Sequence, residues 1–192
     1  MKKKGLVIAA SVMLVLCLAV GGTLAWLMDN SGPVTNTFTY GKVDIELTET
    51  TGTEYKMVPG NTIEKNPTAK VVKDSEDCWL FVKVDEADNF DTFMTYAIAE
   101  GWTLYNTGEQ GANINTAEND TYYIYREVEA STADQSFAIL AGDDVVVNSE
   151  VTKEMFASIG ENKPVLTFTA YAVQKANVTT VEDAFEELGL SL

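Results

Sequence analysis

The pattern of apolar and polar positions first separates the start of the chain from everything after it. Three lysines at residues 2–4 precede an apolar run over residues 6–20, in which Ser11 is the one polar residue, and mostly small residues follow at 21–25. This order of basic, apolar and small-residue segments is typical of a secretory signal peptide. We therefore predict a signal peptide over residues 1–25, cleaved between Ala25 and Trp26, and one exported domain over residues 26–192.

A permanent membrane anchor is the alternative interpretation of the same segment. Residues 5–28 carry no charge, and as a helix they would reach roughly 36 Å, enough to cross a hydrocarbon core of about 30 Å. The apolar run over residues 6–20 would reach only about 22 Å. Gly21 and Gly22 then interrupt the run, which favours a cleaved signal peptide. In either case, membrane contact is expected only through this segment.

Period-two alternation dominates the rest of the chain and predicts strands. In residues 35–48, Val43, Ile45 and Leu47 alternate with polar side chains, which indicates a strand with one buried face. Further strands are expected at residues 78–84, 102–105, 122–128, 136–140, 144–147 and 165–173. Both faces of residues 165–173 are apolar or small, a pattern typical of a buried strand.

Three stretches have a helical period instead. Apolar side chains recur at steps of three and four over residues 88–100, which predicts a short amphipathic helix. Thr152 is a candidate N-cap for a helix over residues 152–159, and Thr180 begins a final helix with Ala184 and Phe185 facing inward. Many short strands with brief helices predict a mainly β single domain, a jelly roll or β-sandwich with short helical insertions.

The charge balance excludes one class of partner. The chain carries 29 acidic and 13 basic residues, a net charge of −16. Removing the three lysines before residue 26 leaves 10 − 29 = −19. A surface with this negative charge repels phosphate backbones, and the sequence contains no Lys/Arg cluster. We therefore expect no nucleic-acid partner. Cations or basic proteins fit this charge better.

The residues that carry most enzyme chemistry are missing. The chain has no histidine, which excludes a Ser-His-Asp triad and the usual zinc motifs. Cys17 lies in the signal peptide, so the exported domain holds only Cys78, expected in a buried strand, and no internal disulfide. We predict no catalytic residue, no cofactor-binding residue and no metal ligand.

Adjacent carboxylates are the remaining candidates for acid–base chemistry or Ca²⁺ binding. In a chain with 29 acidic residues such pairs arise by chance, and none has the spacing of a known calcium loop. No motif therefore supports a Ca²⁺ site. The pairs are Glu76-Asp77, Asp85-Glu86, Asp143-Asp144 and Glu186-Glu187.

Several segments together resemble the TasA/camelysin family, secreted proteins of Gram-positive bacteria whose signals are removed by a dedicated signal peptidase of the SipW type. The resemblance extends over nearly the whole chain. It is most specific at the junction over residues 21–29 and at Ala-Tyr-Ala-Val-Gln, residues 170–174. The other segments that carry it are residues 35–49, 58–60, 79–84, 122–125 and 181–188.

The resemblance implies a jelly-roll subunit of extracellular biofilm-matrix fibres. It implies that the freed N-terminal segment, residues 26–40, is added as a donor strand to the next copy, with Trp26, Phe38 and Tyr40 as its anchors. Partners would then be other copies of the chain and other matrix proteins. Two alternatives remain at this point: a cell-surface metalloendopeptidase of the camelysin type, and a monomeric surface-binding module. The first conflicts with the absence of histidine.

Overall fold

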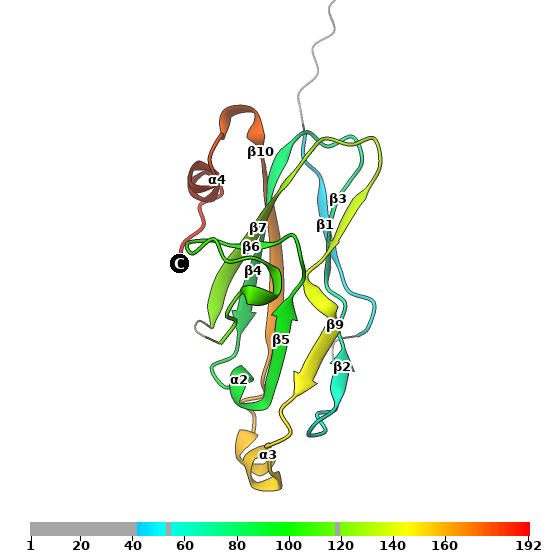
Figure 1. Ribbon diagram of the computed structural model, residues 1–192, viewed down its shortest axis with the longest axis vertical. Helices are drawn as coiled ribbons and strands as arrows, with labels where there is room; N and C mark the ends of the chain where they lie inside the picture. The colour runs from blue at the N-terminus through cyan, green and yellow to red at the C-terminus, as the bar shows by residue number, and fades with distance from the viewer. Residues whose placement is uncertain (1–41, 53–54, 118–119) are drawn as a thin grey trace, which may run out of the picture. The chain divides into compact units, whose positions relative to one another are not determined.

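A computed structural model describes residues 42–52, 55–117 and 120–192 (Figure 1). Contacts divide the chain into two units, Met1–Thr39 and Tyr40–Leu192, and all described residues belong to the second. That unit is mainly β, as the sequence predicts. Its strands are β1 (Ile45–Thr48), β2 (Thr62–Glu64), β3 (Thr68–Val71), β4 (Cys78–Glu86), β5 (Met94–Ile98), β6 (Thr103–Leu104), β7 (Thr121–Val128), β8 (Gln135–Ala138), β9 (Leu140–Val147) and β10 (Leu166–Gln174).

The strands form a two-layered β-sandwich from antiparallel sheets. One layer is the four-stranded sheet β10-β4-β7-β6. The other consists of two three-stranded sheets, β1-β3-β8 and β2-β9-β5. These two sheets continue one another, because β2 leads directly into β3 and its partner β9 follows directly from β8. Figure 1 shows the two sheets as one long layer facing the four-stranded sheet.

Strand β4 lies at the centre of the fold and is covered on both faces. Cys78, Leu80 and Val82 point into the main core between the layers. Trp79 and Phe81 alternate with them and belong to a second apolar cluster on the outer face. Helix α4 (Val181–Glu187) covers that cluster with Ala184 and Phe185. Burial of both faces explains why the strand is continuously apolar in sequence, and it confirms the prediction of a buried Cys78.

Two of the three predicted helices are confirmed. Helix α3 (Lys153–Ile159) begins after Thr152, whose hydroxyl accepts a hydrogen bond from the Met155 amide at 3.3 Å. Helix α4 begins after Thr180, which accepts from the Asp183 amide at 3.1 Å. These contacts satisfy amides that a helix leaves unpaired at its first turn. Short 3₁₀ turns, η1 (Gly111–Asn113) and η2 (Lys175–Asn177), complete the helical elements in the described part of the chain.

The predicted helix over residues 88–100 is wrong. Helix α2 (Phe90–Phe93) forms only one turn, and strand β5 follows it directly. Met94, Tyr96 and Ile98 are buried, so this part of the segment has a period of two. A short run of apolar residues fits both a helical period and a strand period. Pairing of β5 with β9 therefore decides that this segment is a strand.

The buried position predicted for residues 165–173 is also wrong. Among the described residues, β10 pairs only with β4, so it is an edge strand. Its two faces are apolar because the main core covers one and the aromatic cluster under α4 covers part of the other. None of the helices in the described part of the chain has both the length and the apolar character that a bilayer crossing requires.

Candidate strand-docking site

The edge of β10 offers backbone groups to a further strand. Val165 accepts a hydrogen bond from the Ala87 amide at 2.9 Å, and Lys175 donates one to Asp77 at 2.8 Å, so the odd-numbered residues bond to the chain on the β4 side. In an antiparallel ladder the alternate residues then direct their N–H and C=O groups away from that partner. Leu166, Phe168 and Ala170 therefore present theirs along the open edge. Edge groups of this kind are a template for strand addition.

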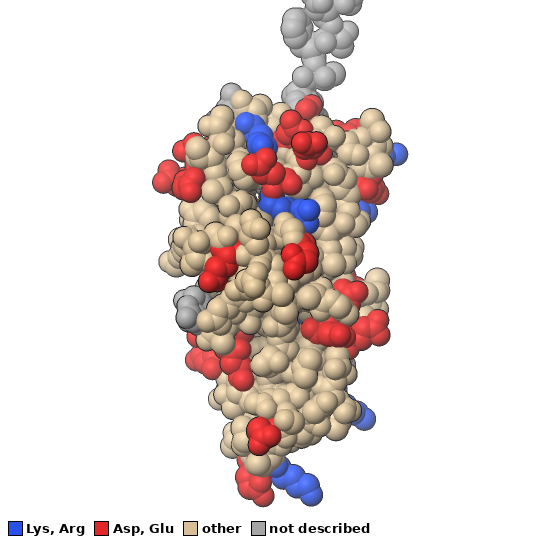
Figure 2. All heavy atoms as spheres, in the orientation of Figure 1, with Lys and Arg blue, Asp and Glu red and all other residues tan. Residues whose placement is uncertain are grey.

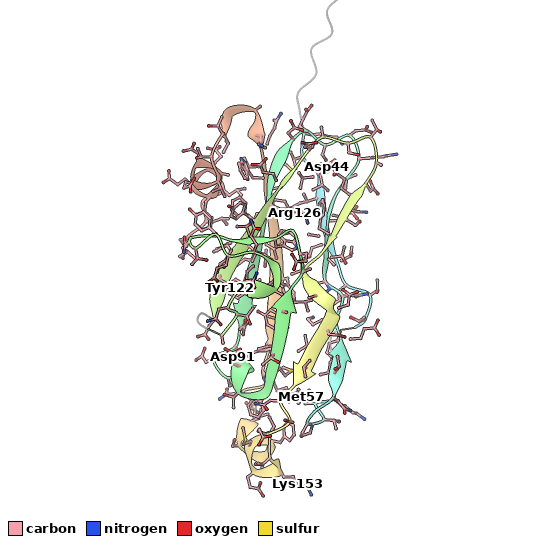
Figure 3. All side chains as sticks on the ribbon, viewed as in Figure 1. Asp44, Met57, Asp91, Tyr122, Arg126 and Lys153 are labelled. Atoms are coloured by element: carbon pink, nitrogen blue, oxygen red, sulfur yellow. The ribbon has the colours of Figure 1, made fainter. Side chains whose placement is uncertain are left out.

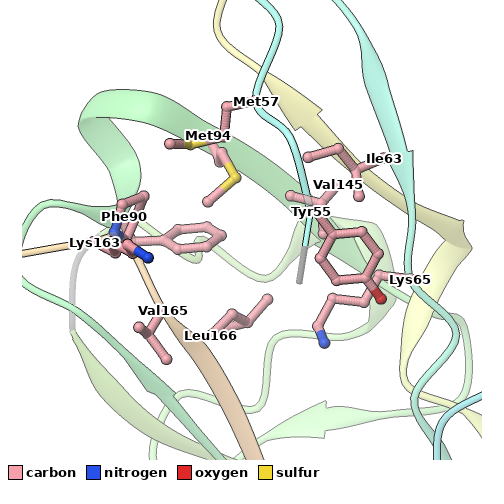
Figure 4. Close-up of a pocket in the computed structure, with 11 residues that line it drawn as sticks. Tyr55, Met57, Ile63, Lys65, Phe90, Met94, Val145, Lys163, Val165 and Leu166 are labelled. Carbon is pink, nitrogen blue, oxygen red and sulfur yellow. The ribbon is translucent and has the colours of Figure 1, made fainter. Parts of the chain in front are cut away.

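An apolar groove lies beside the first residues of β10. Its volume is about 420 Å³, within the range of small-ligand sites. Figure 4 shows Met57, Met94 and Phe90 on one side of this space, Tyr55 and Lys65 on the other, and Leu166 at its base. The complete lining is Tyr55, Met57, Ile63, Lys65, Phe90, Met94, Val145, Lys163, Pro164, Val165 and Leu166.

The space between the open edge of β10 and the opposite layer decides where a strand could enter. Cα atoms of β1 and β10 approach within 8 Å, which leaves no room for a strand that needs about 4.8 Å on each side. Near Leu166, the strand that faces β10 is β2 instead of β1. There the groove lies between the two layers. Val165, at the groove, is 52% exposed although it is apolar. The first half of β10 is therefore the accessible part of the edge.

Two lysines give the groove a basic rim in an otherwise acidic molecule. Lys65 contacts both carboxylate oxygens of Glu49 at 2.8 Å, and its ammonium lies 5.7 Å from the centre of the Phe168 ring. Lys163 extends into the same space from the loop before β10 (Figure 4). The groove therefore combines apolar walls with two lysine side chains, of which Lys65 is neutralised by Glu49.

A buried carboxyl group lies next to the groove. Glu86, at the end of β4, is only 8% exposed and accepts a hydrogen bond from the Tyr96 hydroxyl. The Tyr122 hydroxyl lies 2.6 Å from that of Tyr96. Phe90, a groove residue, packs edge-on against Tyr96 with ring centres 5.7 Å apart. The groove wall and the buried carboxyl group therefore share a side chain.

Burial raises the pKa of Glu86 to about 7. The hydrogen bond from Tyr96 lowers this pKa, whereas the nearby carboxylates of Asp91 and Asp120 raise it. Burial also raises the pKa of both tyrosines, so they remain protonated donors. Glu86 is therefore half-protonated near neutral pH, unlike an ordinary surface glutamate.

The structure does not describe the site residues predicted from sequence. Ala25, Trp26, Phe38 and Tyr40 fall outside the described residues, so the predicted cleavage site and donor strand stay predictions. Nothing in the sequence around these residues indicates that the groove would receive the donor strand. The groove lining comes from several separate segments, and only the period-two alternation of Met94, Tyr96 and Ile98 could have indicated part of it.

The predicted carboxylate pairs are dispersed over the surface, apart from Glu86. Asp85 contacts Lys83 at 2.8 Å, and Asp77 accepts a hydrogen bond from the Ala130 amide at 2.6 Å. Among the described residues, no group of three or more acidic or cysteine side chains is arranged to hold a metal ion. Burial raises the pKa of the Cys78 thiol to about 11, which keeps it unreactive.

Comparisons with known proteins assign no family to this chain. No family model matches it, and no curated protein matches it. A solved structure of an enterococcal surface protein, its partial N-terminal region, aligns with 13% sequence identity and a TM-score of 0.34. The alignment covers 77% of this chain and 41% of that one, so this chain spans less than half of the enterococcal structure. At this level of similarity no functional assignment follows.

Proposed function

We propose that this chain is an exported structural protein that assembles outside the cell by strand addition. Residues 26–40 of one copy pair with the open edge of β10 in the next copy, and apolar side chains of the added strand enter the groove. Trp26, Phe38 and Tyr40 are the anchors of that strand. The observation that supports this proposal best is the edge of β10, which no strand of the described residues pairs with, next to an apolar groove.

The properties of residues 26–40 suit this role. Fully extended, these 15 residues would reach roughly 50 Å, enough to leave one domain and lie along another. Asp29 is their only charged residue, so the strand adds little repulsion between two acidic copies. Figure 2 shows acidic side chains in scattered groups over the visible face of the domain, with fewer basic ones among them. Lys163 at the groove adds a positive charge on the side where the strand would enter.

The same edge supports a second candidate, a monomeric surface module. In that case residues 26–40 of a copy pair with its own β10, and no edge remains for a neighbour. The backbone hydrogen bonds would be equivalent in both arrangements, so concentration dependence distinguishes them. Assembly through a neighbour increases with protein concentration, whereas pairing within one copy does not.

The test compares the secreted chain with three variants by size-exclusion chromatography over a concentration series and by electron microscopy. Deletion of residues 26–40 should give a folded monomer at every concentration. Val165→Glu places a charge in the groove and should weaken assembly by at least about tenfold. Val58→Glu is the matched control, because Val58 is 47% exposed and lies outside the groove lining.

Fibres formed by the deletion variant would overturn the donor-strand proposal. A chain that stays monomeric in every form, with residues 26–40 protected from proteases, would support the monomeric module instead. Equal effects of Val165→Glu and Val58→Glu would remove the groove from the proposal.

A further inference from the structure

Arg126 is the only arginine of the chain and points into the sandwich from β7. It shares a strand face with Tyr122, Ile124 and Val128, which all belong to the main core. Its guanidinium carbon lies 3.8 Å from the centre of the Phe137 ring on β8 and 5.4 Å from that of Trp102. Figure 3 labels Arg126 in the upper half of the molecule, between the two layers. We name this arrangement of Gly101, Trp102, Arg126 and Phe137 the Arg126 slot.

The donors of Arg126 lack protein acceptors in the part of the chain that the structure describes. Its buried Nε has no hydrogen-bond partner there, and none of the ion pairs between described residues involves its guanidinium. By contrast, Lys65, Lys70, Lys83 and Lys175 each hold a carboxylate at 2.6–2.8 Å. Among the described residues, the side chain best suited to bind a carboxylate therefore has no carboxylate of its own.

The surroundings hold the guanidinium in place. The Trp102 indole is fixed by its hydrogen bond to the Ala138 carbonyl at 2.8 Å. Gly101, with φ of +85°, leaves space at the two terminal nitrogens, since a Cβ there would lie 3.3 Å from Nη2 and 3.4 Å from Nη1. Burial lowers the pKa of Arg126, yet an arginine stays charged in proteins. The result is a rigid, charged fork between aromatic rings.

The slot is separate from the groove and is open to a partner. In the sheet order β10-β4-β7-β6, it lies at the edge opposite to β10. Strand β6 pairs only with Ile124 and Tyr125, so it ends before Arg126. Arg126 itself is half-buried, so part of the side chain is accessible to solvent.

We infer that the Arg126 slot binds a carboxylate group presented by a partner protein. A planar carboxylate matches the guanidinium fork in two parallel hydrogen bonds. Stacking on Phe137 fixes the plane of the fork in advance and reduces the entropy that binding would cost. The negative net charge of −16 disfavours polyanions such as nucleic acids, so a single carboxylate of an acidic side chain or a chain end is the class of ligand.

The single arginine allows a direct test on the full chain, kept soluble in a mild detergent. Protein labelled with ¹⁵N-arginine gives one Nε–Hε signal in an NMR spectrum, which needs no assignment. Two probes carry one carboxylate each: N-acetyl-glutamic acid α-amide presents a side-chain carboxylate and N-acetylglycine a terminal one. N-acetyl-glutamine amide is the neutral control, and ionic strength is held constant with sodium chloride.

We expect a saturable shift of the Arg126 signal with one or both carboxylate probes and none with the amide. The probe that binds tighter identifies the source, a side chain or a chain end. With ¹⁵N-tryptophan labelling of both proteins, the response of the Trp102 indole N–H in Arg126→Lys should require at least about tenfold more probe than in the wild type, because an ammonium lacks the planar fork. A thermal unfolding curve of Arg126→Lys that matches the wild-type curve would show that this variant folds.

A linear drift that sodium chloride or the amide reproduces would overturn the inference. So would equal binding by Arg126→Lys, or saturation by inorganic phosphate without any saturation by the carboxylate probes.

Discussion

The hydroxyl of Tyr96 on β5 donates a hydrogen bond to the carboxyl group of Glu86 on β4, and so joins the two layers of the sandwich. Tyr122 on β7 extends the contact through its hydroxyl, 2.6 Å from that of Tyr96. All three side chains are buried. A titratable group in this position couples the pH of the surroundings to the packing of the fold.

Glu86→Gln should change how stability depends on pH. The folded Glu86 has a pKa of about 7, above its ordinary 4.5, so between these values the folded state holds the extra proton. The contribution of this group to the free energy of unfolding therefore falls as pH rises from 4.5 to 7, and stays constant above. Relative to the wild type, Glu86→Gln should gain about 1–3 kcal/mol between pH 4.5 and pH 8.

Urea unfolding of both proteins at pH 4.5, 6 and 8 measures this difference. The comparison between the two proteins cancels the effects of the other carboxylates, which titrate in both. An identical pH dependence in wild type and variant would contradict the raised pKa of Glu86.

Tyr96→Phe should destabilise the domain by about 1–3 kcal/mol, because it leaves a buried acceptor without its donor. It should also raise the pKa of Glu86 further, since the lost hydrogen bond lowers that pKa. Tyr105→Phe is the control, and we expect it to change stability by less than about 0.5 kcal/mol. Equal losses in the two variants would show that the Tyr96 hydroxyl has no special role.

Phe185→Ala should be among the most destabilising substitutions, with a loss of about 3–5 kcal/mol in urea unfolding. The Phe185 ring lies 4.0 Å from the centre of Tyr105, 4.9 Å from Tyr123 and 5.9 Å from Phe81. Removing it opens the aromatic cluster between α4 and the four-stranded sheet. Leu192→Ala, at a side chain that is 67% exposed, provides the control and should have little effect.

Cys78 should resist thiol reagents in the folded protein. The side chain is fully buried, and its pKa of about 11 leaves almost no thiolate at pH 8. With Cys17→Ser in place, Ellman's reagent at pH 8 should react with one thiol only after urea is added. Rapid reaction without urea would show that β4 opens readily.

Local sequence patterns predicted most strands and helices of this fold, but they did not predict the place of each strand in its sheet. The strand at Cys78–Glu86 and the helices capped by Thr152 and Thr180 depend on short-range signals, and they are confirmed. The helix predicted for residues 88–100 is wrong because Met94 and Ile98 fit both a helical and a strand period. Pairing with β9 selects the strand. For β10, an apolar pattern on both faces does not reveal whether an edge is paired.

The candidate sites depend on contacts that no local pattern contains. Lys163 and Ile63 line the same groove, and Arg126 stacks on Phe137, only after the two layers have come together. The lack of histidine and the presence of only two cysteines are facts of the sequence, and they restrict the candidate chemistry without any structure. The geometry of a groove or of an aromatic slot needed the structure.

The long ladder between β10 and β4 has a mechanical consequence. The two strands pair over nine residues, from Leu166 opposite Glu86 to Gln174 opposite Cys78, and β4 is held from both faces by apolar side chains. A pull applied along β10 by an attached neighbour would load all of these pairs in shear at once, instead of opening them one after another. Tension carried from copy to copy would thus be borne by the most deeply buried strand of each domain.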